Sequence, residues 1–141
     1  MQAGAVRRVA AVAIGAMAIS AAAANEVDYS QRLAALVNDY RASRALPALA
    51  VDQAIAGLAR EHSAAMAKAG QLNHDDFPSR VRRSGLAICV ENVGWNYKSP
   101  KDQFDAWRAS RGHDQNMLDK RVVRMGIGTA ANYVTMIACG K

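Results

Sequence analysis

The hydrophobic pattern of this chain changes from helical spacing in its first half to strand-like runs at its end. A first helix is predicted after the capping candidates Asp28 and Ser30 and before Pro47, with an apolar stripe formed by Leu33, Leu36, Val37 and Tyr40. Asp52 is the expected cap of a second helix, and Gly70 its expected end. One face of this second helix is predicted to hold Ile55, Leu58, Ala59, His62 and Met66.

The second half mixes short helices with extended segments. The predicted elements are a short helix over Pro78–Ser84 ended by Gly85, a buried strand over Ala87–Trp95, a helix started by Ser99 and Pro100 that carries Phe104 and Trp107, and a hairpin of Arg121–Thr129 and Tyr133–Ala138 around Ala131-Asn132. No internal repeat or linker separates these segments, so a single domain is expected.

The first 24 residues have the pattern of an export signal. Arg7 and Arg8 precede an apolar run over residues 9–19, and Ala21–Ala24 supply the small residues that a signal peptidase accepts. Cleavage near Ala24 would leave residues 25–141 as one domain in the periplasm or outside the cell. An uncleaved anchor is the alternative, but the run is shorter than the roughly 20 apolar residues of a spanning helix, so no stable membrane span is expected after cleavage.

The charge of the chain is mildly basic. Its net charge of +6 falls to +4 without the leader, because Arg7 and Arg8 are lost and no acid is. The basic residues of the domain are scattered without interleaved aromatic residues; they include Arg80, Arg82, Arg83, Arg121 and Arg124. This pattern favours a solvated surface over a nucleic-acid interface.

Only two cysteines are present, Cys89 and Cys139, and both lie in the segment predicted to be exported. In an oxidising compartment such a pair is most simply one disulfide. No CxxC pattern occurs, so neither a thioredoxin-like site nor a cysteine zinc ribbon is supported.

Three polar residues in separate segments are candidate metal ligands: His74, Glu91 and His113. Neutral imidazole nitrogens and carboxylate oxygens are preferred ligands of zinc-like divalent ions. Only the fold can bring these segments together.

Short motifs along the chain carry a family resemblance. They are Leu36-Val37-Asn38 with Tyr40-Arg41, Leu58–Ser63 with Met66-Ala67, Leu72–His74, Glu91–Val93, Trp107–Ser110, Gly112-His113 with Asn116–Leu118, and Met125–Gly128. In order and spacing the chain resembles bacterial members of the CAP superfamily, the SCP-like domain of cysteine-rich secretory, antigen 5 and pathogenesis-related proteins.

The resemblance implies an α+β fold, a three-layer α-β-α sandwich with a central antiparallel sheet and a polar cleft. His74 and His113 match the two family histidines of that cleft, and Glu91 matches a family glutamate. A second family acid is replaced by Ser110, three residues after Trp107. A serine cannot serve as the general base for a metal-bound water as a carboxylate could, so catalysis is less expected than metal binding.

Other cleft residues receive mainly structural roles. His62 lies on an apolar stripe and is expected to be a buried, hydrogen-bonded residue, while Asn92 and Asn116 are expected to satisfy backbone groups near the cleft. Trp95 and Tyr97 follow a strand and are candidates either for a ligand groove or for the rim of the core.

Function then divides into three hypotheses. The resemblance favours a secreted or periplasmic binding module, not an enzyme, with a cleft for a divalent metal and a small envelope or extracellular ligand. The alternatives are a metal-dependent hydrolase of peptide or cell-wall material, and a structural or interaction protein in which the polar cluster only stabilises the fold.

Overall fold

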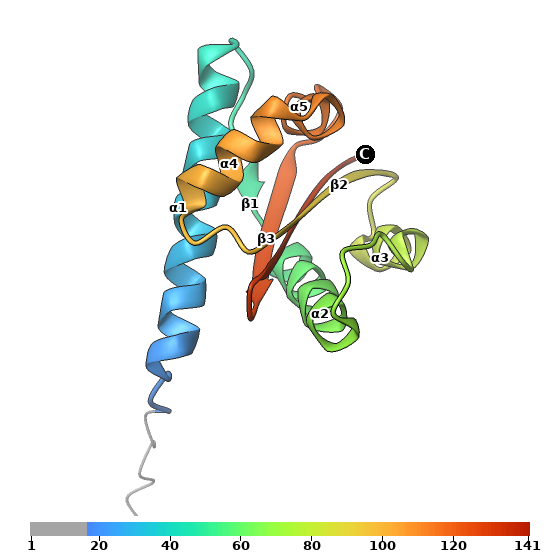
Figure 1. Ribbon diagram of the computed structural model, residues 1–141. Helices are drawn as coiled ribbons and strands as arrows, with labels where there is room; N and C mark the ends of the chain where they lie inside the picture. The colour runs from blue at the N-terminus through green and yellow to red at the C-terminus, as the bar shows by residue number, and fades with distance from the viewer. Residues whose placement is uncertain (1–16) are drawn as a thin grey trace, which may run out of the picture.

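A computed structural model describes residues 17–141, which form a four-stranded sheet between two layers of helices (Figure 1). In chain order the elements are α1 (Ala21–Ser43), β1 (Ala50–Val51), α2 (Gln53–Ala69), α3 (Phe77–Ser84), β2 (Ile88–Trp95), α4 (Pro100–Ala109), α5 (Arg111–Met117), β3 (Arg124–Ala130) and β4 (Tyr133–Gly140). The α+β, three-layer prediction is confirmed.

The strand order is β1-β3-β4-β2. β3 and β4 form the predicted hairpin, whose turn holds Ala131 at a left-handed φ of 51°. β4 also pairs antiparallel with β2, but the two-residue β1 pairs parallel with β3 through Ala50 and Val51. The sheet is therefore mixed, whereas an antiparallel sheet was expected. The difference arises because the short link from α1 to α2 runs alongside β3 in the same direction.

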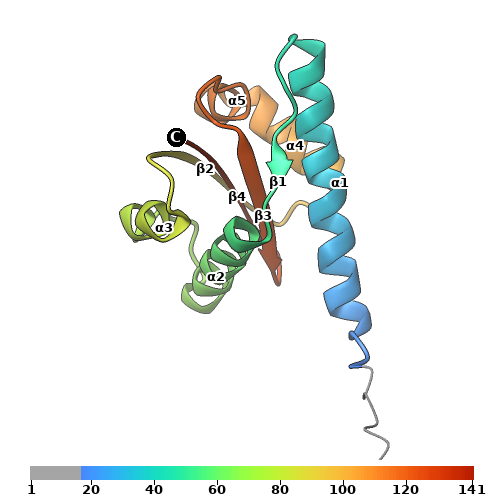
Figure 2. The same cartoon turned by 180° about the vertical axis from the view of Figure 1, so that it is seen from behind.

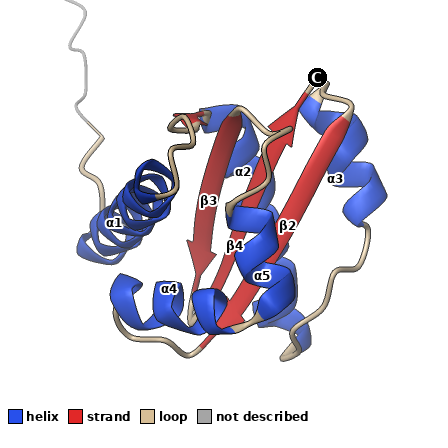
Figure 3. Ribbon diagram, turned by 90° about the horizontal axis from the view of Figure 1, so that it is seen from above, coloured by secondary structure: helices blue, strands red, loops and turns tan. Residues whose placement is uncertain are grey.

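The two helical layers cover opposite faces of the sheet. Helices α1, α4 and α5 lie on one face and α2 and α3 on the other (Figures 2 and 3). Alternate residues of β4 serve the two layers, as strand geometry requires: Met136 and Ala138 pack with α1 and α4, whereas Ile137 and Cys139 pack with α2. The site residues on β2 are divided between the layers in the same way.

Helix α2 is positioned by its caps and by glycines of the sheet. Asp52 accepts hydrogen bonds from the backbone N–H groups of Ala54 and Ile55 (2.9 and 3.1 Å), and Gly70 ends the helix at a left-handed φ of 67°, as predicted. A side chain at Gly126 would collide with the backbone of Ala56. Glycine at this position of β3 therefore lets the α2 backbone lie directly on the sheet.

Helix α1 begins earlier than predicted. It starts at Ala21, and Ser20 caps it by accepting a hydrogen bond from the Ala23 N–H (3.2 Å), so Asp28 and Ser30 lie inside the helix. The alanine-rich segment has high helical propensity and extends the helix outward from the body. The first buried side chain of α1 is Leu33.

The predicted leader lies mostly outside the described residues, and its expected cleavage position at Ala24 falls within the exposed first turns of α1. Within residues 17–141, no helix combines the length and apolar character needed to span a membrane.

Candidate functional site

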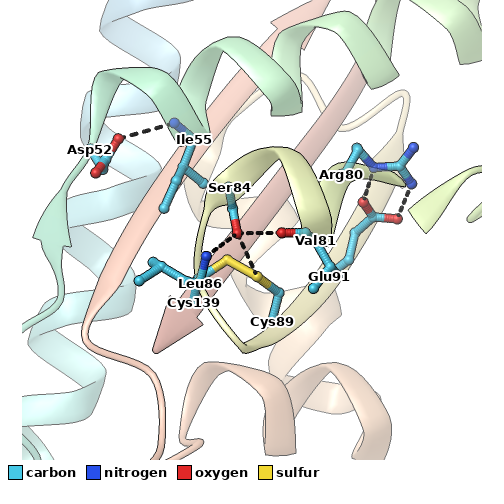
Figure 4. Close-up of a disulfide and its surroundings, with 9 residues drawn as sticks. All are labelled: Asp52, Ile55, Arg80, Val81, Ser84, Leu86, Cys89, Glu91 and Cys139. Carbon is cyan, nitrogen blue, oxygen red and sulfur yellow. Dashed lines mark hydrogen bonds and ion pairs between the residues drawn. A yellow bond between two sulfur atoms is a disulfide. The ribbon is translucent and has the colours of Figure 1, made fainter. Parts of the chain in front are cut away.

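Glu91 is a buried carboxylate held by two hydrogen bonds from one arginine. On α3, the Arg80 Nε donates to Glu91 Oε2 (2.7 Å) and an Nη donates to Oε1 (2.8 Å), as Figure 4 shows. The side chains are 7% and 2% exposed, respectively. Such a bidentate pair fixes the carboxylate in position and orientation.

His74 contacts the same carboxylate from the loop between α2 and α3. Its Nδ1 lies 2.9 Å from Glu91 Oε1, and because an ionised carboxylate only accepts, Nδ1 carries the donated hydrogen. The opposite ring nitrogen, Nε2, then presents a lone pair in the neutral ring. Since the side chain is 54% exposed, the ring is accessible to a ligand from solvent.

His62 supports this loop from α2. It is 4% exposed, and its Nε2 donates to the Asn73 carbonyl (2.8 Å), while the nearer Glu91 oxygen is 3.8 Å away. The residue therefore anchors the backbone next to His74, a structural role for this histidine of the apolar stripe.

His113 comes from α5, in the opposite helical layer. Burial lowers the pKa of His113, and the nearby charge of His74 lowers the pKa further. The His113 ring therefore favours its neutral form near neutral pH.

An amide pair fixes α5 against β2. Asn92 Nδ2 donates to the His113 carbonyl (3.0 Å), and Asn116 Nδ2 donates both to Asn92 Oδ1 (2.8 Å) and to the Glu91 carbonyl (3.2 Å). Asn92 is fully buried. These two side chains join the strand that carries Glu91 to the helix that carries His113.

The predicted disulfide between Cys89 and Cys139 is present and is confirmed. The two residues lie directly opposite each other on β2 and β4, with Cα atoms 4.1 Å apart. Cys89 precedes Glu91 by two positions and so projects from the same face of β2. The bond therefore fixes the register of the strand that positions Glu91.

The three candidate ligands thus form a contacting pair and a nearby third residue. Within residues 17–141, no group of three or more His, Cys, Asp or Glu side chains is arranged to hold a metal ion. Both Glu91 oxygens already accept hydrogen bonds from the positive guanidinium of Arg80. The Glu91 carboxylate is therefore better placed to orient the His74 ring than to coordinate a cation directly.

Comparison with known proteins agrees with this architecture. Residues 34–136 match the cysteine-rich secretory protein family, CAP. The chain belongs to the CAP family. It is 26% identical over 107 residues to the uncharacterized protein YkwD of Bacillus subtilis. This alignment covers 71% of this chain and 42% of YkwD.

Three solved structures share the fold. An extracellular SCP-domain protein from Bacillus anthracis superposes with a TM-score of 0.80 at 24% identity, covering 89% of this chain and 45% of the other. A cysteine-rich secretory protein from Staphylococcus aureus gives 0.75 at 17% identity (82% and 39%), and an outer surface protein of Borrelia burgdorferi gives 0.71 at 16% (79% and 91%). The chain spans less than half the length of the two Bacillus proteins and the Staphylococcus protein.

In this CAP domain, Ser110 lies at the junction of α4 and α5. It is the N-cap residue of α5, but its side chain makes no capping hydrogen bond. No hydrogen bond links its hydroxyl to His113 in the described structure.

The sequence analysis missed Arg80, the strongest partner of the site. It was counted among the solvated basic residues, but it is 6% exposed and also donates to the Asp75 carbonyl (2.6 Å). The available signal was its position on α3: Arg80 follows Phe77 by three residues and so lies on the inward face of the helix.

Proposed function

We propose that this CAP protein is a secreted or periplasmic binding module whose His74 and His113 together bind a divalent ion of the zinc type. The proposal rests mainly on the contact between His74 Nδ1 and Glu91, which leaves Nε2 of an accessible ring as the coordinating atom. A carboxylate that orients a ligating histidine in this way also raises its basicity.

The same geometry favours binding over catalysis. Glu91 is held by Arg80 and His74, and Ser110 occupies the position where related domains have a second acid, so neither of these two positions supplies a free carboxylate to take a proton from a bound water. Two histidines leave open positions at the ion for water or for a donor atom of a small envelope or extracellular ligand.

Titration calorimetry with zinc should therefore detect one site that needs both rings. His74→Ala and His113→Ala should each weaken binding by about tenfold or more, because each removes one of two protein ligands. Ser110→Glu should tighten binding by adding a carboxylate at the α4–α5 junction.

His62→Gln is the matched control for this experiment, since it removes the third histidine while keeping a side chain that can donate to the Asn73 carbonyl. It should leave zinc affinity unchanged. Equal affinity in wild type, His74→Ala and His113→Ala would support a purely structural role of the cluster instead.

Export to the periplasm or out of the cell is a separate expectation. Intact-mass measurement and N-terminal sequencing of envelope fractions should find a chain that begins near Asn25. Ala22→Phe with Ala24→Phe should block processing, because signal peptidase needs small residues before the cut. A full-length product that stays in the cytoplasm would contradict the proposed location.

A further inference from the structure

Helix α5, which carries His113, contributes little apolar surface to the core. It has seven residues, and Met117 is its only buried side chain. A helix of this length is not stable by itself, so contacts with the rest of the domain must fix its position. Asn92 and Asn116 supply such contacts to β2. A second set of contacts comes from α1.

Tyr40 of α1 binds the residue that follows His113. Its hydroxyl donates to Asp114 Oδ1 (2.8 Å), 74 positions later in the chain. Burial, and then the hydrogen bond to Asp114, raise the pKa of Tyr40 above its ordinary value, so the phenol keeps its proton and remains a donor near neutral pH. This hydrogen bond joins the first turn of α5 to α1.

The Tyr40 ring is held by its own neighbours. It is 8% exposed, and it packs edge-to-face against Phe104 of α4, with the ring centroids 5.6 Å apart and the planes at 79°. The guanidinium carbon atoms of Arg44 and Arg108 lie 5.3 and 5.5 Å from its centroid. Because the ring is confined in this way, its hydroxyl is a fixed point of attachment for α5.

The next residue of α1, Arg41, holds the other end of α5. Arg41 is 1% exposed, and its Nη1 donates to the carbonyls of Met117 (3.0 Å) and Asp119 (2.9 Å). Its Nε donates to the Pro47 carbonyl (2.9 Å). Two consecutive residues of α1 therefore secure the two ends of the helix that carries His113.

The His113 ring packs against Trp107 of α4, with the ring centroids 6.4 Å apart and the planes at 49°. Asp114 is the next residue of the chain, so without its bond to Tyr40 the first turn of α5 is free to shift relative to Trp107. A zinc-type ion tolerates little displacement of a ligand, since its bonds to histidine nitrogen are only about 2.0–2.1 Å long.

We propose that Tyr40 is a positioning residue that fixes the His113 ring for metal binding through its hydrogen bond to Asp114. This inference rests on the proposed function of His113. Tyr40 contacts no ligand itself and acts only through the placement of α5. The affinity of the cleft then depends on α1, a helix that supplies none of the proposed metal ligands.

Tyr40→Phe tests the role of the hydroxyl, because it keeps the ring. The first readout is metal-free: the ring-proton resonances of His113, measured by NMR at about pH 8, where imidazole is mostly neutral. The ring current of Trp107 makes these resonances sensitive to where the His113 ring lies, so they should shift in Tyr40→Phe. The second readout is titration calorimetry with zinc, in which affinity should fall by about tenfold.

Tyr29→Phe is the matched control for this experiment. It makes the same substitution on the same helix and removes hydrogen bonds to the carbonyls of Tyr97 (2.9 Å) and Ser99 (3.3 Å) at the start of α4. Thermal unfolding should show a similar loss of stability in the two variants. Only Tyr40→Phe should change the His113 resonances and the zinc affinity, which a general loss of stability would not do.

Variants of Asp114 test whether Tyr40 acts through this residue. Asp114→Ala should weaken zinc binding as Tyr40→Phe does, and the two changes combined should be no worse than either alone, because they remove the same bond. Asp114→Asn keeps an oxygen that can accept from the Tyr40 hydroxyl, so it should retain most of the affinity that Asp114→Ala loses.

The metal-binding and positioning proposals fail on different outcomes. If the wild type binds no zinc, the proposed function is wrong, and the His113 resonances still decide the role of Tyr40. The positioning role is overturned if Tyr40→Phe leaves these resonances at their wild-type values or if Tyr29→Phe changes them as much. It is also overturned if the wild type binds zinc and Tyr40→Phe binds it equally well.

Discussion

Arg80→Met should lower the free energy of unfolding by about 3–5 kcal/mol, because it leaves the buried Glu91 carboxylate without its cationic partner. Glu91 has only 2% of its side chain exposed, and two of its three closest hydrogen bonds come from Arg80. Neither water nor the partly exposed His74 can replace a bidentate guanidinium at this depth. Chemical denaturation, with the slope compared between variants, measures the loss.

Two further variants isolate the charge effect. Arg82→Met changes an exposed arginine of the same helix and should alter stability by no more than about 0.5 kcal/mol. Arg80→Met combined with Glu91→Leu should recover much of the loss, since a buried ion pair replaced by apolar groups is often neutral. If Arg80→Met costs no more than Arg82→Met, the ion pair does not hold the site together.

Cys89→Ser with Cys139→Ser should cost roughly 2–5 kcal/mol, the usual loss when a small secreted domain is deprived of its disulfide. The bond closes a loop across 50 positions, and on the chain-entropy account such a loop is worth on the order of 4 kcal/mol. Denaturation with and without reductant measures the effect. Reductant should destabilise the wild type and leave the double variant unchanged.

The buried location of Cys139 requires a second variant, because serine would place a hydroxyl in the core. Cys89→Ala with Cys139→Ala removes the bond without adding a polar group and should lose a similar amount. Free, readily alkylated thiols in the exported and folded protein would refute the disulfide.

Local signals in the sequence predicted much of the fold. The whole of α2 is defined by neighbours in the chain: Asp52 caps it, Gly70 ends it, and its apolar stripe repeats at helical spacing. Ser99 and Pro100 define the start of α4 in the same way. These features need no knowledge of distant residues.

Elements that depend on distant partners were not predictable. β1 has two residues and exists only because Ala50 and Val51 pair with β3, more than seventy positions later. Helix α5 is one short segment of polar composition, held by the contact between Asn92 and the His113 carbonyl.

The residues of the candidate site were proposed from family motifs, but their connections were not predictable. His74, Glu91 and His113 were selected through family motifs, whereas spacing alone could not show that the Glu91 carboxylate is held by Arg80. A buried arginine on a short, charged helix has the same composition as a solvated one. Only the packing of α3 against β2 distinguishes them.

The amide and indole groups beside β2 also cover part of an edge of the sheet. β2 is an edge strand, because it pairs with β4 on one side only. On its other side the Val93 carbonyl accepts from Trp107 Nε1 (3.0 Å) and the Glu91 carbonyl accepts from Asn116 (3.2 Å). These carbonyls are therefore not available to a strand of a second molecule, so α4 and α5 protect this part of the sheet against edge-to-edge aggregation.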